Sequence, residues 1–310
     1  MRTTRPLQLT VAAATLALAV TACGAKTTNT GSTNPTSGGT ASSSPSASGG
    51  KTDNAAAAKA ALPKAIKDKG TITVASDETY PPIESVKGTT AVGLDPDLAA
   101  AMGAVLGVKF KFVNSGFDGI VPAVKGHRYD IAMSAMSDTK VRQQVVNFVD
   151  YFSAGTSVIV AKGNPKGIKG LDATMCGLTV AAEKGTVQID EAKAQSKKCP
   201  AGKPITVNAF PDQTGVESAL QAGRADAVLS DSPVNALLVS TSGGKFEAVP
   251  GALYDSGPYG IAVPKDSPDL QKALQLALQA VIDSGQYKTI LAKWKLSDGA
   301  IKTVTINAGT

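Results

Sequence analysis

From Gly70 onward, short apolar runs alternate with longer segments whose apolar residues recur at helical spacing. We predict strands over seven of these runs: TITVAS (71–76), VKFKFV (108–113), YDIAMSA (129–135), SVIVAK (157–162), LTVAAE (178–183), ITVNAF (205–210) and ADAVLSD (225–231). Regular alternation of strands and helices is typical of open, mainly parallel sheets covered by helices. The pattern therefore predicts an α/β protein.

The clearest helical stripe lies in DPDLAAAMGAVLG (95–107). We expect Asp95 to cap this helix and Gly107 to end it. A second stripe runs through SPDLQKALQLALQAVIDSG (267–285) and continues in QYKTILAKW (286–294). Stripes of this kind indicate helices that pack on a hydrophobic core.

The N-terminal segment does not follow this alternation. Arg2 and Arg5 precede an apolar run at 9–20, and small residues then lead to Cys23, which is the order of a secretory signal. The run is short for a membrane span. A cysteine at the cleavage point matches the bacterial lipobox, so we predict a lipoprotein signal peptide over residues 1–22 and a lipid on Cys23. An ordinary signal peptide with an incidental cysteine is the alternative.

Thr, Ser, Gly, Ala, Asn and Pro make up almost all of the chain from Gly24 to about Asn54. Such a segment has too few apolar residues to fold, so we predict a flexible linker over residues 23–57. The helix-prone segment 55–70 then leads into the folded part. These features predict an extracytoplasmic protein that a lipid holds on the outer face of the cell membrane, or in the periplasm where the host has an outer membrane.

The net charge and the cysteines narrow the range of functions that this protein could have. The formal net charge of +6 falls to +4 when the signal peptide with Arg2 and Arg5 is removed, and the basic residues are scattered. This is a poor footprint for nucleic-acid binding. Cys176 and Cys199 form an even pair in an exported protein, which favours a disulfide over two free thiols. The only histidine, His127, lies in a polar turn, which argues against a zinc site.

About 240 residues remain for the folded part, enough for one large domain or two small ones. Both cysteines fall in the middle third of the chain. A disulfide closing this segment suggests that the middle third folds as a lobe of its own.

Several motifs resemble, in sequence order, family 3 of the bacterial extracellular solute-binding proteins, the amino-acid receptors of ABC importers. They are DETYPPIES (77–85), GLDPDLAAAMGAVLGV (93–108), GFDGIVPAVKGHRYDIAMSAMSDTKVRQQVVNFVDYF (116–152), EKGTVQ (183–188), GRADAVLSD (223–231) and PYGIAVPKDSPDL (258–270). The resemblance spans about Gly70 to Leu296.

The resemblance implies a two-lobed, periplasmic-binding-protein-like fold of type II with two hinge crossings. Lobe 1 would comprise residues 70–152 plus 257–300, and lobe 2 residues 153–256. The crossings would fall near Tyr151–Gly155 and Asp255–Pro258. This division agrees with the lobe inferred from the cysteines.

An amino acid carries a carboxylate and an ammonium group, and a site that removes both from water must pair both. Arg142 suits the carboxylate, because a planar guanidinium donates two parallel hydrogen bonds. Asp231, at the end of a predicted strand, suits the ammonium. The alternatives are a solvated loop arginine and an aspartate that caps a turn or helix.

The resemblance implies the other groups that hold the amino-acid backbone. The N–H groups of Ser137 and of Val187, which follows Thr186 in the GT turn, would donate to the carboxylate. The Ala135 carbonyl and the Ser137 hydroxyl would accept from the ammonium. Thr139 is expected to cap the segment that holds Arg142.

Four further residues match family positions around the ligand's side chain. Tyr80 and Phe117 would sandwich it, although both could be ordinary core aromatics. Asp77 and Glu183 match specificity positions, and two carboxylates there favour a basic or amide side chain over an acidic one. Asp77 could instead bond only local backbone.

The sequence thus predicts a substrate-binding lipoprotein that captures a free amino acid, with a polar or basic side chain favoured, for an ABC permease of the cytoplasmic membrane. We expect a monomer with no cofactor, no metal, no catalytic residue and no nucleic-acid partner. A sensor lipoprotein without transport remains open. An exported enzyme on the same fold, such as a dehydratase, also remains open, but GxSxG and metal-ligand clusters are absent from the sequence.

Overall fold

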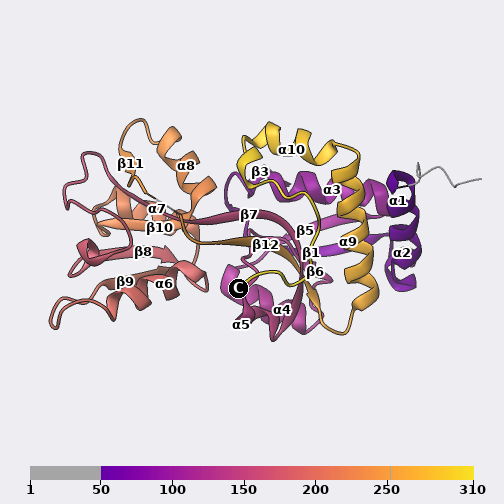
Figure 1. Ribbon diagram of the computed structural model, residues 1–310, viewed down its shortest axis with the longest axis horizontal. Helices are drawn as coiled ribbons and strands as arrows, with labels where there is room; N and C mark the ends of the chain where they lie inside the picture. The colour runs from indigo at the N-terminus through magenta and orange to yellow at the C-terminus, as the bar shows by residue number, and fades with distance from the viewer. Residues whose placement is uncertain (1–49, 252) are drawn as a thin grey trace, which may run out of the picture. The chain divides into compact units, whose positions relative to one another are not determined.

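The computed structural model describes residues 50–251 and 253–310, which form one large sheet, one small sheet and the helices that cover them (Figure 1). The strands of the large sheet are β1 (Thr71–Ser76), β5 (Lys109–Asn114), β6 (Ile131–Ala132), β7 (Val146–Ala161), β8 (Thr179–Glu183), β9 (Thr206–Phe210), β10 (Ala227–Asp231), β11 (Phe246–Ala248) and β12 (Tyr254–Pro264). The small sheet contains β2 (Thr79–Tyr80), β3 (Glu84–Lys87) and β4 (Thr90–Val92).

The α-helices alternate with these strands, as the hydrophobic pattern predicts. They are α1 (Gly50–Ala61), α2 (Lys64–Lys69), α3 (Leu94–Leu106), α4 (Ile120–Lys125), α5 (Lys140–Gln143), α6 (Val187–Ser196), α7 (Gln213–Gln221), α8 (Ser232–Thr241), α9 (Pro268–Asp283) and α10 (Gln286–Trp294). Three short 3-10 helices are η1 (Phe117–Gly119), η2 (Ala173–Met175) and η3 (Ser297–Gly299) in the described residues.

The large sheet has the strand order β5-β1-β6-β12-β7-β10-β8-β9, and β11 also pairs with β7. Each end of this order is parallel: β1 pairs with β5 and β6, and β8 pairs with β9 and β10. The centre is antiparallel, because the chain leaves the first group of strands along β7 and returns along β12. The predicted parallel pairing therefore holds for the outer strands, and the sheet as a whole is mixed.

The fold has two lobes, which β7 and β12 join (Figure 1). Lobe 1 contains β1, β5 and β6, and lobe 2 contains β8, β9 and β10. Lobe 2 has hydrophobic clusters of its own, one around Val180 and Leu229 and one around Val228 and Leu220. Separate cores are what two independently packed units require.

Helix α1 begins at Gly50, inside the linker predicted to extend to residue 57. It packs against α3 and α9, and it buries Ala58. The structure corrects this linker boundary, because the alanine run of the segment favours helix and finds a partner on lobe 1. The predicted signal peptide 1–22, Cys23 and most of the linker lie outside the described residues.

Asp95 does not cap α3, contrary to the sequence prediction. The N-cap is Gly93, with a φ of 145°, and its Cβ would lie 2.1 Å from the Ile83 carbonyl oxygen. Asp95 therefore falls within the first turn, fully buried. Its Oδ2 accepts hydrogen bonds from the Tyr151 hydroxyl (2.9 Å) and the Ala135 N–H (3.4 Å).

The strand predicted over residues 129–135 is much shorter in the structure, where β6 covers Ile131–Ala132. The backbone leaves the sheet soon afterwards, because Ala135 adopts a φ of 44°, in the left-handed region that a strand cannot contain. Ser137 rejoins the sheet only through a single antiparallel bridge with Tyr259. The bend at Ala135 therefore separates β6 from the bridge at Ser137.

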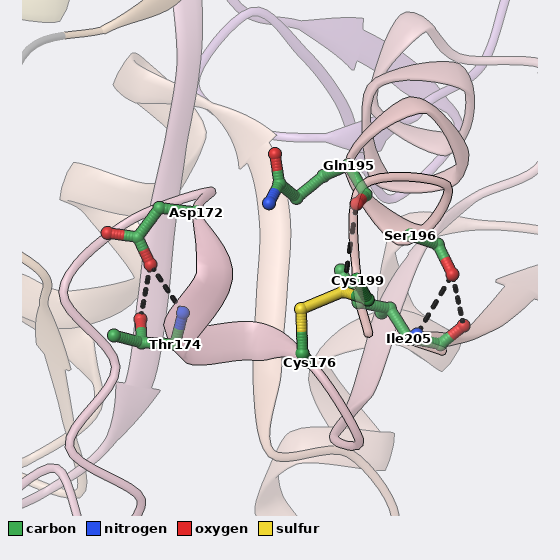
Figure 2. Close-up of a disulfide and its surroundings, with 7 residues drawn as sticks. All are labelled: Asp172, Thr174, Cys176, Gln195, Ser196, Cys199 and Ile205. Carbon is green, nitrogen blue, oxygen red and sulfur yellow. Dashed lines mark hydrogen bonds between the residues drawn. A yellow bond between two sulfur atoms is a disulfide. The ribbon is translucent and has the colours of Figure 1, made fainter. Parts of the chain in front are cut away.

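The predicted disulfide between Cys176 and Cys199 is confirmed, with Cα atoms 5.5 Å apart (Figure 2). Cys176 follows η2, and Cys199 follows α6. Beside it, the Ser196 hydroxyl accepts a hydrogen bond from the Ile205 N–H (2.9 Å). The disulfide thus ties the end of α6 to the loop before β8.

Replacing both Cys176 and Cys199 with serine is expected to lower the free energy of unfolding by roughly 3 kcal/mol, since the crosslink restricts the unfolded chain. The two residues are 23 positions apart, which sets the size of the closed loop. Urea denaturation of the oxidised protein and of the double variant measures this difference. Equal stability of the two proteins would contradict the expectation, as would alkylation of two free thiols in the exported protein.

Candidate functional site

One cavity collects all ten residues that the sequence predicts as ligand contacts. It is nearly closed in this structure, with a volume of about 10 Å³, which is room for about one water molecule. The predicted residues that line it are Asp77, Tyr80, Phe117, Ala135, Ser137, Arg142, Glu183, Thr186, Val187 and Asp231. Glu84, Ser134 and Gln188 also line it, and the sequence analysis did not single them out.

The cavity lies where strands of both lobes end. Asp77 directly follows β1, whereas Glu183 and Asp231 are the last residues of β8 and β10. Ligand sites of open α/β sheets lie at the carboxyl ends of the strands. The sheet topology therefore brings these three carboxyl groups to the same cavity.

Arg142 is half-buried and points inward, unlike a solvated loop arginine. Its Nη1 donates to the Ser137 carbonyl (2.7 Å), and its Nη2 donates to the Gly185 carbonyl (3.0 Å). The guanidinium also lies 5.3 Å from the centre of the Phe117 ring. As predicted, the Thr139 hydroxyl caps α5 by accepting from the Arg142 N–H (3.3 Å).

Burial lowers the pKa of Arg142 to about 10, and the negative charge of Asp231 opposes that shift. Arg142 is therefore charged at neutral pH. Both of its hydrogen bonds in the structure go to neutral carbonyl groups, so no carboxylate side chain neutralises it by direct contact among the described residues. An anionic group that entered the cavity beside α5 would supply that charge.

Asp231 is buried at the end of β10. Its carboxylate accepts hydrogen bonds from the Tyr80 hydroxyl (3.0 Å) and the Gln188 amide (2.9 Å). Burial raises the pKa of Asp231 to about 6, and the neighbouring groups of Tyr259, Tyr80 and Gln188 oppose that rise. Asp231 is also the N-cap residue of α8, but its side chain makes no cap hydrogen bond.

Asp77 has two sets of contacts. Its Oδ1 accepts from the Thr79 N–H (3.1 Å) and its Oδ2 accepts from the Phe117 N–H (3.2 Å), so it does bond nearby backbone. It also faces Glu183 across the cavity. Burial raises the pKa of Glu183 to about 9, and repulsion from Asp77 adds to the rise.

Glu84 and Ser134 extend the polar wall beneath the cavity. The Ser134 hydroxyl donates to Glu84 Oε1 (3.0 Å) and accepts from the Asp77 N–H (2.8 Å). Glu84 and Asp95 lie side by side in the buried interior, and burial raises the pKa of both carboxyl groups. Repulsion from Asp95 adds to the rise in the pKa of Glu84.

Polar contacts close the cavity between the two lobes. They join Tyr80 to Asp231, Thr79 to Gln213, Arg142 to Gly185, and Asp118 to Lys184. At Gly185, a Cβ would lie 2.8 Å from the Asp118 Cα, so a side chain there would prevent this approach. Residues of both lobes therefore enclose the space.

Four of the lining residues are carboxylic acids and one is a base. The acids are Asp77, Glu84, Glu183 and Asp231, and the base is Arg142. Such an excess of carboxyl groups disfavours an acidic ligand side chain, which would add one more carboxyl group with no second base to pair it, and favours a cationic side chain, which these groups can pair. Among these lining residues, Arg142 offers the one position for an anionic group.

Outside the cavity, His127 lies on the surface as predicted, 3.0 Å from Asp266. Across residues 50–251 and 253–310, no group of three or more His, Cys, Asp or Glu side chains is arranged to hold a metal ion. In the same part of the chain, no helix combines the length and the apolar composition that crossing a membrane requires.

Comparison with known proteins gives a consistent result. The model of the family "Bacterial extracellular solute-binding proteins, family 3" matches residues 72–297. The arginine-binding protein ArgT of Corynebacterium glutamicum is 34% identical over 253 residues, which cover 80% of this chain and 82% of that protein.

Two solved structures are similar along nearly their whole length. An ancestral arginine-binding protein bound to arginine has a TM-score of 0.67 and 33% identity, covering 73% of this chain and 98% of the other. The ancestral amino acid-binding protein AncCDT-1, a precursor of cyclohexadienyl dehydratase, has a TM-score of 0.67 and 30% identity, covering 74% and 97%.

Proposed function

We propose, from the premise that the chain belongs to family 3 of the bacterial extracellular solute-binding proteins, that it captures a free amino acid with a basic side chain for uptake by an ABC transporter. One observation carries the choice of side chain: a single guanidinium and four carboxyl groups line the cavity. An amino acid with a basic side chain brings one anionic and two cationic groups. This charge pattern complements that of the cavity.

The amino-acid backbone would lie between the lobes. Arg142 would pair with the carboxylate, with the N–H groups of Ser137 and Val187 as further donors. Asp231 would pair with the ammonium, with the Ala135 carbonyl and the Ser137 hydroxyl as further acceptors. Pairing both charges would offset the cost of removing them from water.

The side chain would extend between Tyr80 and Phe117 toward Asp77, Glu84 and Glu183. Aromatic faces attract a cation, and carboxylates pair with it. The similarity to arginine-binding proteins supports arginine as the first ligand to test.

Thermal unfolding with a panel of free amino acids tests this function. Arginine and lysine are expected to raise the unfolding temperature most, because a ligand that binds only the folded state stabilises it. Glutamine is expected to raise it less, and glutamate not at all. A shift with glutamate as large as that with arginine would refute the proposed selectivity, and no shift with any amino acid would refute the function.

Affinity for arginine is expected to rise between pH 5 and pH 8. Burial holds the pKa of Asp231 at about 6 and that of Glu183 at about 9 in the unliganded site. A cationic ligand favours the ionised form of these carboxyl groups, so binding releases protons. Acidification opposes this release. For each proton released, the affinity is expected to fall by up to about tenfold per pH unit as the pH is lowered.

Calorimetry in buffers of different ionisation enthalpy counts the protons released. In Glu183→Gln this number is expected to fall, and the pH dependence to flatten. Affinity that increases on acidification would contradict the expected linkage.

We propose that the protein turns nothing over, in contrast to the enzyme alternative. The proposal rests on the charged groups of the cavity, one guanidinium and four carboxyl groups, which suit charge pairing with a bound amino acid. Arginine recovered after long incubation with the protein is expected to be chemically unchanged. Recovery of an altered product would favour the dehydratase-like alternative, which the similarity to AncCDT-1 keeps relevant.

We also propose the membrane anchor and the lobe boundaries. Lobe 1 would comprise residues 70–152 plus 257–300 and lobe 2 residues 153–256, a division supported by the continuous strands β7 and β12. Cys23 would carry the lipid that tethers a monomeric receptor beside its permease. Uptake of labelled arginine, measured in cells with and without the protein, distinguishes this function from that of a sensor. A transport receptor is needed for uptake, whereas loss of a sensor would leave uptake unchanged.

Replacing Cys23 with serine is expected to abolish lipid attachment and leave arginine affinity unchanged. The anchor and the ligand site lie in different parts of the chain, so each can change alone. Intact-mass measurement and detergent partitioning of the wild type and the variant test the anchor. A lipid-sized mass that persists on Cys23→Ser would refute it.

A further inference from the structure

The chain after η3 runs back along lobe 1, and its last residues lie beside α5 (Figure 1). We call residues Thr305–Thr310 the C-terminal strap. The strap pairs with β7: the Asp150 N–H donates to the Thr305 carbonyl (3.0 Å), and the Asn307 N–H donates to the Phe148 carbonyl (3.2 Å). The strap is thus held as a short extra strand segment.

Side chains reinforce this attachment. The Phe148 N–H donates to Asn307 Oδ1 (2.7 Å). Asp150 Oδ2 accepts from the Thr305 hydroxyl (2.7 Å) and the Ala308 N–H (3.2 Å). These bonds fix the position from which the end of the strap reaches α5.

The end of the strap holds the loop that carries Arg142. The Gly309 N–H donates to Asp138 Oδ2 (2.8 Å), and the Lys140 N–H at the start of α5 donates to the Thr310 carbonyl (3.2 Å). The Gln143 amide donates both to Asp138 Oδ1 (2.8 Å) and to the Gly309 carbonyl (3.3 Å). The strap therefore contacts α5 at both of its ends.

Gly309 fits this position because it lacks a side chain. It is buried, and a Cβ on it would lie 1.8 Å from the Asp138 carbonyl oxygen. Even alanine therefore requires the strap and the Asp138 loop to move apart.

Helix α5 needs such support, since it comprises only the four residues Lys140–Gln143. A helix of one turn is unstable alone, because its nucleation is unfavourable and its first N–H groups lack helical partners. The strap supplies a partner for one of these groups and fixes the loop before it. A charged group that binds a ligand requires this kind of support to stay in position.

We propose that the C-terminal strap positions Arg142 for the carboxylate of the ligand, so that residues 305–310 act on the ligand site without lining it. This inference rests on the proposed function. The strap lies outside residues 72–297 that match the family model. Its role follows from the contacts of this chain.

A double-mutant cycle between Gly309→Ala and Arg142→Ala tests the proposal by calorimetry with arginine. Gly309→Ala alone is expected to weaken binding by about tenfold, a coupling typical of residues that act through one another. In the Arg142→Ala background the same change is expected to alter affinity less than about twofold. Thr303→Ala is the control, because Thr303 is an exposed residue near the strap. It should leave the affinity for arginine unchanged in both the wild type and the Arg142→Ala variant.

Equal losses in both backgrounds would overturn the proposal, because a strap that only supports the fold would weaken binding regardless of Arg142. No loss in the wild-type background would also overturn it. If Gly309→Ala does not fold, Gln143→Ala takes its place in the cycle, since it removes the two hydrogen bonds that tie α5 to Asp138 and to the Gly309 carbonyl without adding volume.

Hydrogen exchange separates a failure of this inference from a failure of the proposed function. A wild-type protein that binds no amino acid refutes the function alone. The strap is then judged by exchange over residues 138–144, which is expected to be at least about tenfold faster in Gly309→Ala while β8 and β9 keep their rates. Unchanged exchange over residues 138–144 would overturn the positioning role.

Discussion

Replacing Arg142 with alanine is expected to weaken binding of arginine by at least about thirtyfold. The guanidinium is turned inward by the Ser137 and Gly185 carbonyl groups, 2.7 and 3.0 Å away. Without it, the ligand carboxylate would be buried with backbone donors alone. Losing one partner of a desolvated charge pair costs about 2–5 kcal/mol, and the lower value corresponds to about thirtyfold.

The Arg142→Ala substitution should lower the free energy of unfolding much less than it weakens the binding of arginine. Alanine removes the packing on the Phe117 ring and two hydrogen bonds, but α5 is a short helix, so we expect a loss in the free energy of unfolding of about 1 kcal/mol, the value typical of single substitutions. Calorimetry and thermal unfolding of the same samples compare the two effects, with His127→Ala as a control that should affect neither. Unchanged affinity would reduce Arg142 to an ordinary loop arginine, and the site assignment would fall.

Replacing Asp231 with asparagine is expected to cause a loss of similar size. The amide keeps the volume of the buried side chain but removes the charge that would pair with the ligand ammonium. Its NH₂ group would also face the Tyr80 and Gln188 donors, 3.0 and 2.9 Å from the native carboxylate. An unpaired ammonium in the closed cavity accounts for most of the expected loss.

An arginine analogue without the α-amino group tests whether Asp231 is the residue that pairs with the ligand ammonium. Wild type should bind this analogue at least about thirtyfold more weakly than arginine. Asp231→Asn should discriminate little between the two. Asp266→Asn, an exposed change of the same kind, serves as the control. The same discrimination in wild type and Asp231→Asn would place the ammonium elsewhere.

The residues that could be predicted from the sequence have local signals. Thr139 stands three residues before the backbone N–H that it caps, and Cys176 and Cys199 are the only cysteines after Cys23. Arg142, Glu183 and Asp231 lie in motifs at the ends of predicted strands. The resemblance of these motifs to the family, together with the need to pair both charges of an amino acid, was enough to assign the three residues to one site.

The residues that were missed depend on contacts between distant segments. Glu84 begins a short strand in a polar stretch, where nothing local distinguishes a buried glutamate from an exposed one. Its partners in the interior are the neighbouring carboxyl group of Asp95 and the hydroxyl of Ser134, which lies 50 residues further along the chain. The C-terminal strap has neither a helical nor a strand period, and it pairs with β7 about 160 residues earlier. Sequence patterns carry no information about such pairing.

The strand order also has a consequence for export, in which the chain emerges with its N-terminal end first. β6 of lobe 1 pairs on one side with β1, which emerges before it, and on the other with β12, which emerges more than 100 residues later. All the strands and helices of lobe 2 lie between them. Lobe 2 can therefore fold from one continuous segment. Until β12 and α9 emerge, the sheet of β1, β5 and β6 remains incomplete, and the edge of β6 that pairs with β12 stays exposed. The part of the molecule translated first is completed last, and chaperones outside the membrane would meet lobe 1 rather than lobe 2.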